Sequence, residues 1–366
     1  MTPGPTEVEQ RVLDSLAKPP MLHYGEEWKR FYSSTLELMR KLFDADSDDM
    51  IILVPAAGSA CLEMAIINLA HSGEKILNLR NGYFGEITKE CGKRHDMQVL
   101  EFETEYGKPI SASKVKEMLQ GDENIRAIML VHNETSTGVL NSVEEIGHLA
   151  KHFGVPLIVD TVSSFGALRV KMKEWNCSIC VGYASKGLSA ISGVVPMAIK
   201  REVWDDVCKR DQRIGSGRFF SFQVWDRYIR EWGSWGHPFP TTMPTSVIRA
   251  LNVAANIALD EGLDQRASRH QRVAAQLRKD IRGIGLTILP DEGFASSTVT
   301  AVTLTNEAQD KARAVMEKEY GVIISGGLSV LKNKIIRIGH MGVTATSACT
   351  DRAVTALDNS LRRIVS

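Results

Sequence analysis

A single lysine, Lys186, stands in a stretch of small and apolar residues, VGYASKGLSAISGVVPMAI, that covers positions 181–199. Lysine side chains are rarely fully buried, and burying an unpaired ammonium group costs free energy. An aspartate, Asp160, ends another apolar run, LIVD, and a carboxylate at such a place needs a partner to stay charged. A lysine and an aspartate that each follow a buried strand are candidates for nucleophilic and electrostatic roles in catalysis.

Small and hydroxyl-bearing residues follow two further apolar runs. The sequence VPAAGSACLE places Ala57, Gly58 and Ser59 at the predicted start of a helix. Backbone N–H groups at a helix N-terminus are free to bind an anion such as phosphate. The sequence VHNETSTGVL adds the hydroxyls of Thr135 and Ser136 in a turn. Small residues also begin helices for packing reasons, so phosphate binding is one of two interpretations of the first segment.

Together these residue types match what pyridoxal 5'-phosphate requires. A lysine forms its Schiff base, a carboxylate pairs with its pyridinium nitrogen, and backbone N–H groups hold its phosphate. In an open parallel sheet, ligands bind beyond the carboxyl ends of the strands, where these residues are expected. The alternatives are that Asp160 caps a helix and that Lys186 extends to solvent along its alkyl chain.

Short apolar runs alternate with helix-like segments through most of the chain. This alternation predicts an α/β fold with a mostly parallel sheet that helices cover on both faces. The sequences SACLEMAIINLA and SVEEIGHLAKHFG are typical of the intervening helices. The predicted strands cover 50–55, 75–79, 97–102, 125–132, 156–160, 177–184 and 193–199.

The N-terminal segment predicts helices before the first strand. Thr6 and Glu9 form a capping-box pattern ahead of a short helix, and residues 26–43 predict a second helix. The tryptophan- and glycine-rich stretch 202–245 is interpreted as a connecting and interface region.

The C-terminal third predicts a separate, smaller unit. A long helix with the sequence TSVIRALNVAANIALDEG is followed by three strand-like runs and two helical segments, which indicates an α+β domain. We therefore expect an N-terminal arm over 1–20, a large α/β domain over 21–250 and a small C-terminal domain over 251–366.

Over nearly its whole length the sequence resembles the class V aminotransferases of fold type I, and especially the alanine–glyoxylate and serine–pyruvate group. The resemblance implies the fold type I architecture, with a large domain that binds the cofactor and a smaller C-terminal domain. It rests on the segments PGPTEV, AAGSACLEMAIIN, NGYFG, HNETSTGVLNSVEEIG, LIVDTVSSFGA, ASKG and KIIRIGHMG.

The resemblance also implies a role for each matched residue. Lys186 would form the Schiff base and Asp160 would pair with the ring nitrogen, while Ala57, Gly58 and Ser59 would bind the phosphate. The remaining implied contacts are Phe84 stacking on the ring, Val162 packing on it, Thr135 on its phenolic oxygen, Arg337 on the substrate carboxylate, and Tyr24 in substrate binding.

The sequence departs from the family pattern at the phosphate site. Many relatives carry a polar side chain such as glutamine or histidine before the lysine, whereas this chain has Ser185, which implies a shorter or lost phosphate contact. Thr242 matches a threonine that reaches the phosphate of the partner subunit. The tyrosine usual just upstream is replaced by Phe239, so one phosphate hydrogen bond is expected to be missing.

The resemblance implies a transaminase that moves an amino group from alanine or serine to glyoxylate or pyruvate by a ping-pong Schiff-base mechanism. A homodimer with shared active sites is also implied. One alternative is an aminotransferase for another donor, pyridoxamine or aminoethylphosphonate with pyruvate. Another is a lyase of the cysteine desulfurase type, for which Cys349 and Cys208 are candidate nucleophiles.

Composition excludes several other classes of function. Lys+Arg and Asp+Glu are both 44, so no excess charge favours nucleic acid or an anionic membrane as a partner. No apolar run approaches the roughly 20 residues that span a bilayer. Six irregularly spaced cysteines and an N-terminus without a signal-peptide pattern favour the cytoplasm.

Two short patterns could indicate a metal site, but each lacks further ligands. Cys177 and Cys180 form one CxxC without a second pair, so they are interpreted as buried thiols. His148 and His152 lie four residues apart on a predicted helix and are interpreted as part of a solvated face. No metal is therefore expected in the site.

Overall fold

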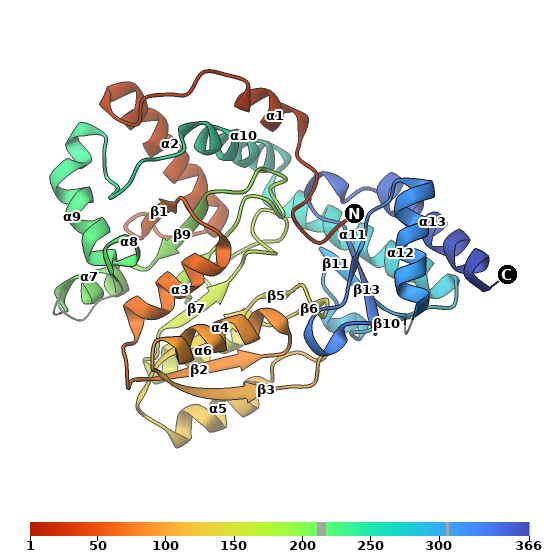
Figure 1. Ribbon diagram of the computed structural model, residues 1–366. Coiled ribbons are helices and arrows are strands. Elements are labelled where there is room, and N and C mark those ends of the chain that lie inside the picture. Colours follow the sequence, from red (N-terminus) through yellow and green to blue (C-terminus); the bar gives the residue numbers. More distant parts are fainter. Residues whose placement is uncertain (211–216, 305–306, 366) are drawn as a thin grey trace.

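The computed structural model describes residues 1–210, 217–304 and 307–365, and its largest element is a seven-stranded sheet (Figure 1). The strand order is β1-β9-β8-β7-β4-β2-β3; β9 runs antiparallel to β1 and β8, and the other pairs are parallel. The seven predicted strands and the mostly parallel sheet are thus confirmed. The strands are β1 Met50–Val54, β2 Lys75–Arg80, β3 Gln98–Glu103, β4 Ile125–Val131, β7 Leu157–Asp160, β8 Ile179–Val181 and β9 Val195–Ile199.

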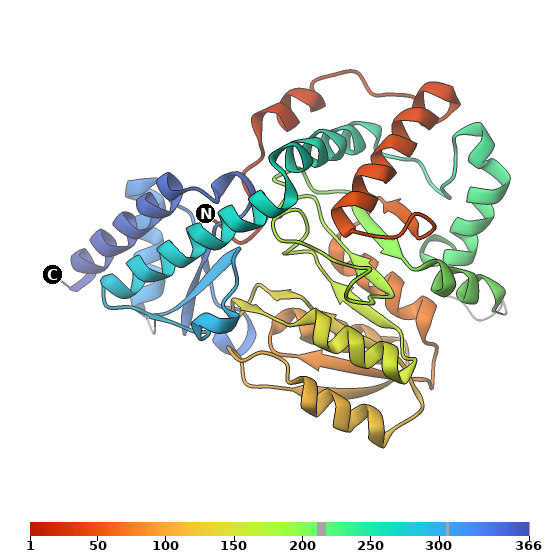
Figure 2. The ribbon, with the colours of Figure 1, turned by 180° about the vertical axis from the view of Figure 1, so that it is seen from behind.

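Helices cover both faces of this sheet, as the alternating pattern predicts. Figure 1 shows α3 and α4 in front of the sheet, and Figure 2, from behind, shows α5 and α6 on the opposite face. Helix α3 is apolar around most of its circumference, which suits a helix packed between the sheet and its neighbours. These helices are α3 Gly58–Leu69, α4 Tyr83–Arg94, α5 Ala112–Gly121 and α6 Val143–Phe153.

A second, four-stranded antiparallel sheet lies in the C-terminal part, with the order β10-β11-β13-β12. Helices α11, α12 and α13 cover one of its faces and enclose a separate apolar cluster around Leu277, Met316 and Leu357 (Figure 1). The elements are β10 Thr287–Ile288, β11 Val299–Thr303, β12 Ser325–Gly326, β13 Ile335–Gly339, α11 Leu263–Gly283, α12 Glu307–Tyr320 and α13 Ser347–Val365, with 3-10 turns η2 Glu292–Phe294, η3 Ser329–Leu331 and η4 Gly342–Thr344.

The N-terminal helices and the predicted long helix pack beside the large sheet. Helix α10 (Thr245–Glu261) contacts both α1 (Gln10–Leu16) and α2 (Gly25–Phe43), and it leads into α11 through Gly262. Gly262 has a φ of +82°, a backbone conformation that glycine adopts without steric cost, and it separates the two helices. A short hairpin of β5 (Asn133–Glu134) and β6 (Val139–Leu140) extends from the large sheet toward the small one.

The predicted capping box of Thr6 and Glu9 does not form, because α1 begins only at Gln10. Glu9 itself caps this helix by accepting a hydrogen bond from the backbone N–H of Arg11. The hydroxyl of Thr6 instead donates to the carbonyl of Lys186, 3.0 Å away.

The described residues of the stretch 202–245, which leave out 211–216, contain more helix than the predicted connecting region implies. It carries α7 (Arg201–Lys209), α8 (Gly217–Phe220), α9 (Phe222–Trp232) and the 3-10 turn η1 (Gly233–Trp235). The side chains of Trp204 and Trp225 are buried, whereas those of Trp232 and Trp235 are exposed.

The close approach of α6 to the turn before β8 gives a stability prediction. A Cβ atom at Gly147 would lie 1.7 Å from the carbonyl oxygen of Trp175, so Gly147→Ala must displace backbone. Overpacking of this kind costs about 1–3 kcal/mol of unfolding free energy. Urea unfolding followed by circular dichroism measures the loss. Gly121→Ala, at the end of α5 with open space around the added atom, is the matched control, and equal stability of the two variants would contradict the packing argument.

Candidate active site

The predicted site residues gather at the carboxyl ends of three adjacent strands of the large sheet. Asp160 is the last residue of β7 and pairs with Val131 of β4 on one side and Val181 of β8 on the other. Thr135 follows the end of β4, and Lys186 follows the end of β8. Parallel neighbours carry their ends to one edge, so residues distant in sequence become neighbours there.

Lys186 lies in a partly buried position under the N-terminal segment. Its amine donates a hydrogen bond to the carbonyl of Pro3, 2.7 Å away. Gly4 packs so closely against it that a Cβ at that position would lie 2.4 Å from Nζ. Burial is the main cause that lowers the pKa of Lys186 to about 8, and nearby Arg337 lowers it further, while Asp160 raises it. A larger share of the amine is therefore neutral near pH 7 than for an exposed lysine, about a tenth, and the neutral form is the one that acts as a nucleophile or base.

The carboxyl group of Asp160 is buried without a cationic partner. Burial raises its pKa to about 7, against the opposing effects of Lys186 and of the Val162 N–H, which donates to Oδ1 over 2.8 Å. Within the described part of the chain, no arginine or lysine forms an ion pair with it. A cation placed beside Asp160 would stabilise its charged form.

Arg337 of β13 reaches from the small sheet to the same place. Its Nη1 donates to the carbonyl of Thr135 over 3.2 Å, and its Nε donates to the carbonyl of Gly326 over 2.8 Å. The side chain of Thr135 shares a 2.6 Å hydrogen bond with Ser163. Burial lowers the pKa of Arg337 to about 10, so the guanidinium stays charged at neutral pH. Its unused N–H groups suit a carboxylate.

The helix start at 57–59 adjoins these residues. Ala57 is the N-cap of α3, and its side chain makes no capping hydrogen bond. A Cβ at Gly58 would lie 2.9 Å from Val162 Cγ2, so the turn packs directly against the segment after Asp160. Ala57 and Ser59 are exposed, which leaves the backbone N–H groups open to an anion.

Glu134 belongs to the site but was not singled out from the sequence. Its side chain is fully buried and accepts hydrogen bonds from the backbone N–H of Phe84 (3.1 Å) and from both N–H and hydroxyl of Ser136 (2.9 and 2.6 Å). Burial raises its pKa, and its charge acts on Lys186 and Arg337. A glutamate directly after an apolar strand was the available signal.

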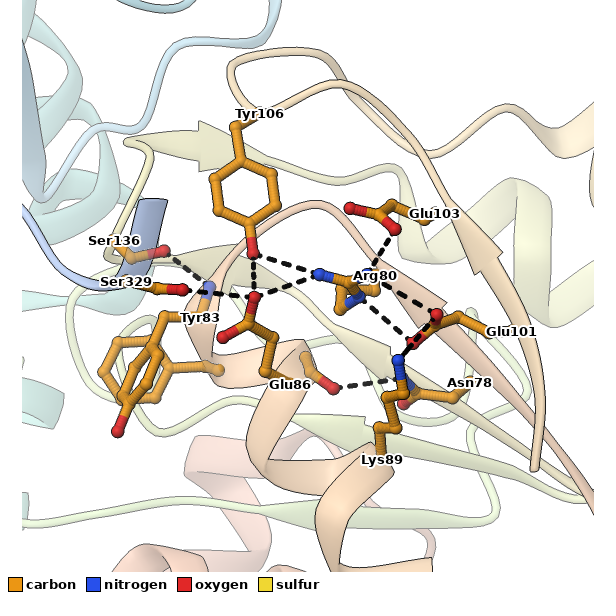
Figure 3. Close-up of polar contacts among 12 residues, drawn as sticks. Asn78, Arg80, Tyr83, Glu86, Lys89, Glu101, Glu103, Tyr106, Ser136 and Ser329 are labelled. Atoms are coloured by element: carbon orange, nitrogen blue, oxygen red, sulfur yellow. Dashed lines mark hydrogen bonds and ion pairs between the residues drawn. The ribbon is translucent and has the colours of Figure 1, made fainter. Parts of the chain in front are cut away.

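A polar network, drawn in Figure 3, fixes the start of α4. This segment carries Phe84, whose side chain is partly buried. Arg80, at the end of β2, donates to Glu86 over 3.0 Å and to Glu101 over 3.1 Å, and it also pairs with Glu103. The hydroxyl of Tyr106 donates to Glu86 over 2.5 Å. These bonds hold the first turn of α4, whose second residue is Phe84.

Three of the predicted site residues stand apart from this cluster. Tyr24 is 55% exposed at the start of α2, and Thr242 is exposed before α10. Ser185 is buried, and its carbonyl accepts from the N–H of Thr6 over 3.0 Å and from the Thr6 hydroxyl over 3.3 Å, which are structural contacts. Phe239, the expected departure, is buried among the rings of Trp28, Tyr32 and His237.

The alternatives for the two central residues do not hold. Residues 161–164, directly after Asp160, form a turn and no helix for it to cap. Lys186 does not extend to solvent, because its amine is bound to the N-terminal segment. Elsewhere, Cys177 and Cys180 are buried thiols as predicted, and His148 and His152 are exposed on α6.

Comparison with known proteins supplies the family. Residues 4–352 match the family model described as aminotransferase class-V. The chain belongs to the class V aminotransferases. It is 33% identical over 364 residues to an uncharacterised aminotransferase of Methanocaldococcus jannaschii, covering 98% of this chain and 92% of that one.

Further class V aminotransferases align over comparable lengths. The pyridoxamine–pyruvate transaminase of Mesorhizobium japonicum is 29% identical, with 99% of this chain and 91% of that one covered. The ureidoglycine–glyoxylate aminotransferase structure from Bacillus subtilis has a TM-score of 0.94 at 26% identity, covering 100% of this chain and 93% of that one. The protein is thus an aminotransferase with the fold type I architecture. Among its described helices, none is long and apolar enough to cross a membrane.

The buried Asp160 carboxyl gives a pH-dependent stability prediction for the cofactor-free protein. The folded protein holds this proton up to about pH 7, whereas the unfolded chain releases it near pH 4, about its ordinary value. Stability attributable to Asp160 therefore falls as the pH rises from about 4 to about 7. Asp160→Asn removes this loss, so the variant gains stability over the parent as pH rises, by at most about 4 kcal/mol.

Urea unfolding at pH 5 and pH 8 measures this difference. Asp264→Asn is the control, because the side chain of Asp264 is 87% exposed. A gain from Asp160→Asn that is the same at both pH values would contradict the argument.

Proposed function

We propose that the protein is a pyridoxal 5'-phosphate-dependent transaminase that transfers the amino group of alanine or serine to glyoxylate or pyruvate. The observation that carries the proposal is the convergence of three ionisable groups. Lys186, Asp160 and Arg337 come from three segments of the chain, and Lys186 interacts electrostatically with both of the others. Each has the pKa shift that burial at one common site produces.

The free groups of the site fit pyridoxal phosphate. The carboxyl of Asp160, which has no ion-pair partner among the described residues, suits a protonated ring nitrogen. The backbone N–H groups at the start of α3, near Gly58, suit the phosphate. Val162 and Phe84 would contact the ring, and Thr135 its phenolic oxygen. Ser185 would be a weaker phosphate contact from this chain, and Thr242 would contact the phosphate bound by the partner subunit. When bound, the cofactor supplies an electron sink that stabilises negative charge at the substrate Cα.

The protein groups then have separate tasks. Lys186, as a neutral amine, would take the proton from the substrate Cα and deliver it to C4' of the cofactor. Arg337 holds the substrate carboxylate with two N–H groups, which orients the Cα–H bond. Asp160 keeps the ring nitrogen protonated. A single site thus serves donor and acceptor in turn, which gives ping-pong kinetics.

Support for the substrates comes from the family. Glyoxylate is in the name of the Bacillus subtilis relative, and pyruvate is in that of the Mesorhizobium japonicum one. The second name also favours the alternative donor, pyridoxamine; aminoethylphosphonate remains a further alternative donor. For the desulfurase alternative, which needs a thiolate, Cys208 has less support because burial raises its pKa to about 12. Cys349, at the start of α13, is the other candidate nucleophile for that alternative.

We further infer a homodimer in the cytoplasm, with Tyr24 and Thr242 serving the partner's site. The exposure of both residues on this chain is consistent with that role. The division into an arm (1–20), a large domain (21–250) and a small domain (251–366) is part of the same proposal.

The visible absorption of the purified protein tests the cofactor and the half-reaction together. After incubation with pyridoxal phosphate we expect a visible band that L-alanine bleaches and glyoxylate restores. Lys186→Ala should lose the bleaching and restoration of this band, because the variant has no amine at the proposed Schiff-base position. A wild-type protein that stays colourless with pyridoxal phosphate would contradict the cofactor, whereas a coloured protein that ignores alanine but responds to pyridoxamine would favour the alternative donor.

Arg337 gives a second prediction. Arg337→Gln leaves a neutral group that cannot pair with a carboxylate, so kcat/KM for alanine should fall about 100-fold or more. The bound cofactor spectrum should stay unchanged, because Arg337 is not proposed to contact it. The spectrum before alanine is added reports cofactor binding, and the stopped-flow bleaching rate at several alanine concentrations reports the reaction with the substrate. Unchanged kinetics would remove Arg337 from the substrate site.

A further inference from the structure

A cavity of about 480 Å³ opens beside Arg337. It lies between the start of α12 and the segment from β12 to β13. This cavity is named the distal pocket below. Its lining includes Arg313, Ser325, Gly326, Ser329 and Lys332 besides Arg337.

The distal pocket carries an excess of positive charge. Arg313, Lys332 and Arg337 contribute three cations, and Asp310 is the one carboxylate among its lining residues. Asp310 pairs with Nη1 of Arg313 over 3.1 Å. Nε of Arg313 is buried and has no hydrogen-bond acceptor among the described residues. An unpaired, buried guanidinium nitrogen is costly unless a ligand completes it.

The two guanidinium groups lie on either side of one residue, Gly326. Its carbonyl accepts from Arg337 Nε over 2.8 Å, and a Cβ at this position would lie 3.0 Å from Arg313 Nη1. The charge of Arg313 lowers the pKa of Arg337, as expected for two cations so close together. Two cations this close to one glycine suit a ligand with two acidic groups.

The wall of the distal pocket is fixed to the large domain by the network of Figure 3. Ser329, in the 3-10 turn η3, donates to Glu86 over 3.3 Å, and Glu86 is held in turn by Arg80 and Tyr106. The segment that lines the pocket is therefore tied to the helix that carries Phe84. This contact fixes the pocket relative to the proposed cofactor position.

We propose that the distal pocket binds the second acidic group of a dicarboxylic substrate, with Arg337 on one carboxylate and Arg313 and Lys332 on the other. The proposal rests on the proposed transaminase function and adds acidic amino or oxo acids to its substrates. A carboxylate at Arg313 and Lys332 would offset the excess positive charge of the pocket. Small neutral donors such as alanine leave this pocket unused.

The first test compares an acidic with a neutral donor. The ratio of kcat/KM for L-aspartate to that for L-alanine should fall about tenfold in Arg313→Gln and by a smaller factor in Lys332→Gln, since each substitution removes one charged contact. Lys318→Gln, on the exposed face of α12, is the matched control and should keep the wild-type ratio. An unchanged ratio in Arg313→Gln overturns the proposal.

A binding test on the protein loaded with pyridoxal phosphate does not depend on turnover. Succinate, a dicarboxylate without an amino group, should raise the melting temperature of the wild type in a saturable way, and propionate should do so less. Arg313→Gln should reduce the succinate effect to the level of propionate. Inorganic phosphate is the third probe, and a phosphate effect larger than that of succinate would assign the pocket to a phosphate group and overturn the dicarboxylate assignment.

The two tests separate this proposal from the proposed function. If no donor is transaminated but succinate stabilises the wild type and not Arg313→Gln, the transaminase function fails and the pocket stands. If alanine is transaminated but succinate acts no better than propionate, the function stands and the distal pocket is refuted. Loss of folding in Arg313→Gln is detected by its circular dichroism, and Lys332→Gln then decides by the same comparison.

Discussion

The interaction on which the site depends is the placement of a lysine amine and an aspartate carboxyl in one poorly solvated space. Burial pushes the pKa of Lys186 down to about 8 and that of Asp160 up to about 7, and their mutual attraction offsets only part of each shift. Both groups are thus partly neutral near pH 7. An amine that is neutral at working pH is a nucleophile and a base, and an unpaired carboxyl attracts a cation.

Much of the surrounding structure serves to hold these groups in place. The N-terminal segment covers Lys186 through the carbonyl of Pro3, and Thr6 binds the carbonyls of Ser185 and Lys186. From the other side, buried Arg266 of α11 donates to the carbonyls of Gly166 and Gly187. The lysine turn is therefore held by the N-terminal segment on one side and by α11 on the other.

The junction of the two sheets sets the substrate side of the site. Arg337 lies on β13 of the small sheet and donates to Thr135, which lies in the hairpin after β4 of the large one. Glu134, buried in the same hairpin, balances the charges of Arg337 and Lys186. Any motion of the small sheet would move Arg337 relative to Lys186. The distance between the Arg337 guanidinium and the Lys186 amine therefore depends on how the two sheets pack.

The sequence by itself determined the fold class and singled out Lys186 and Asp160, because buried strands are visible as apolar runs and a charged residue at the end of such a run is conspicuous. Arg337 lies in the middle of a strand, and only the resemblance to the class V aminotransferases singled it out. Only the tertiary structure decided what depends on contacts between distant segments. Thr6 binds the lysine turn and does not cap α1, since its local pattern says nothing of residues 180 positions away. The contacts of Glu134 with the start of α4 and the approach of Arg313 to Gly326 could likewise not be predicted, because spacing along the chain does not encode which side chains meet across two sheets.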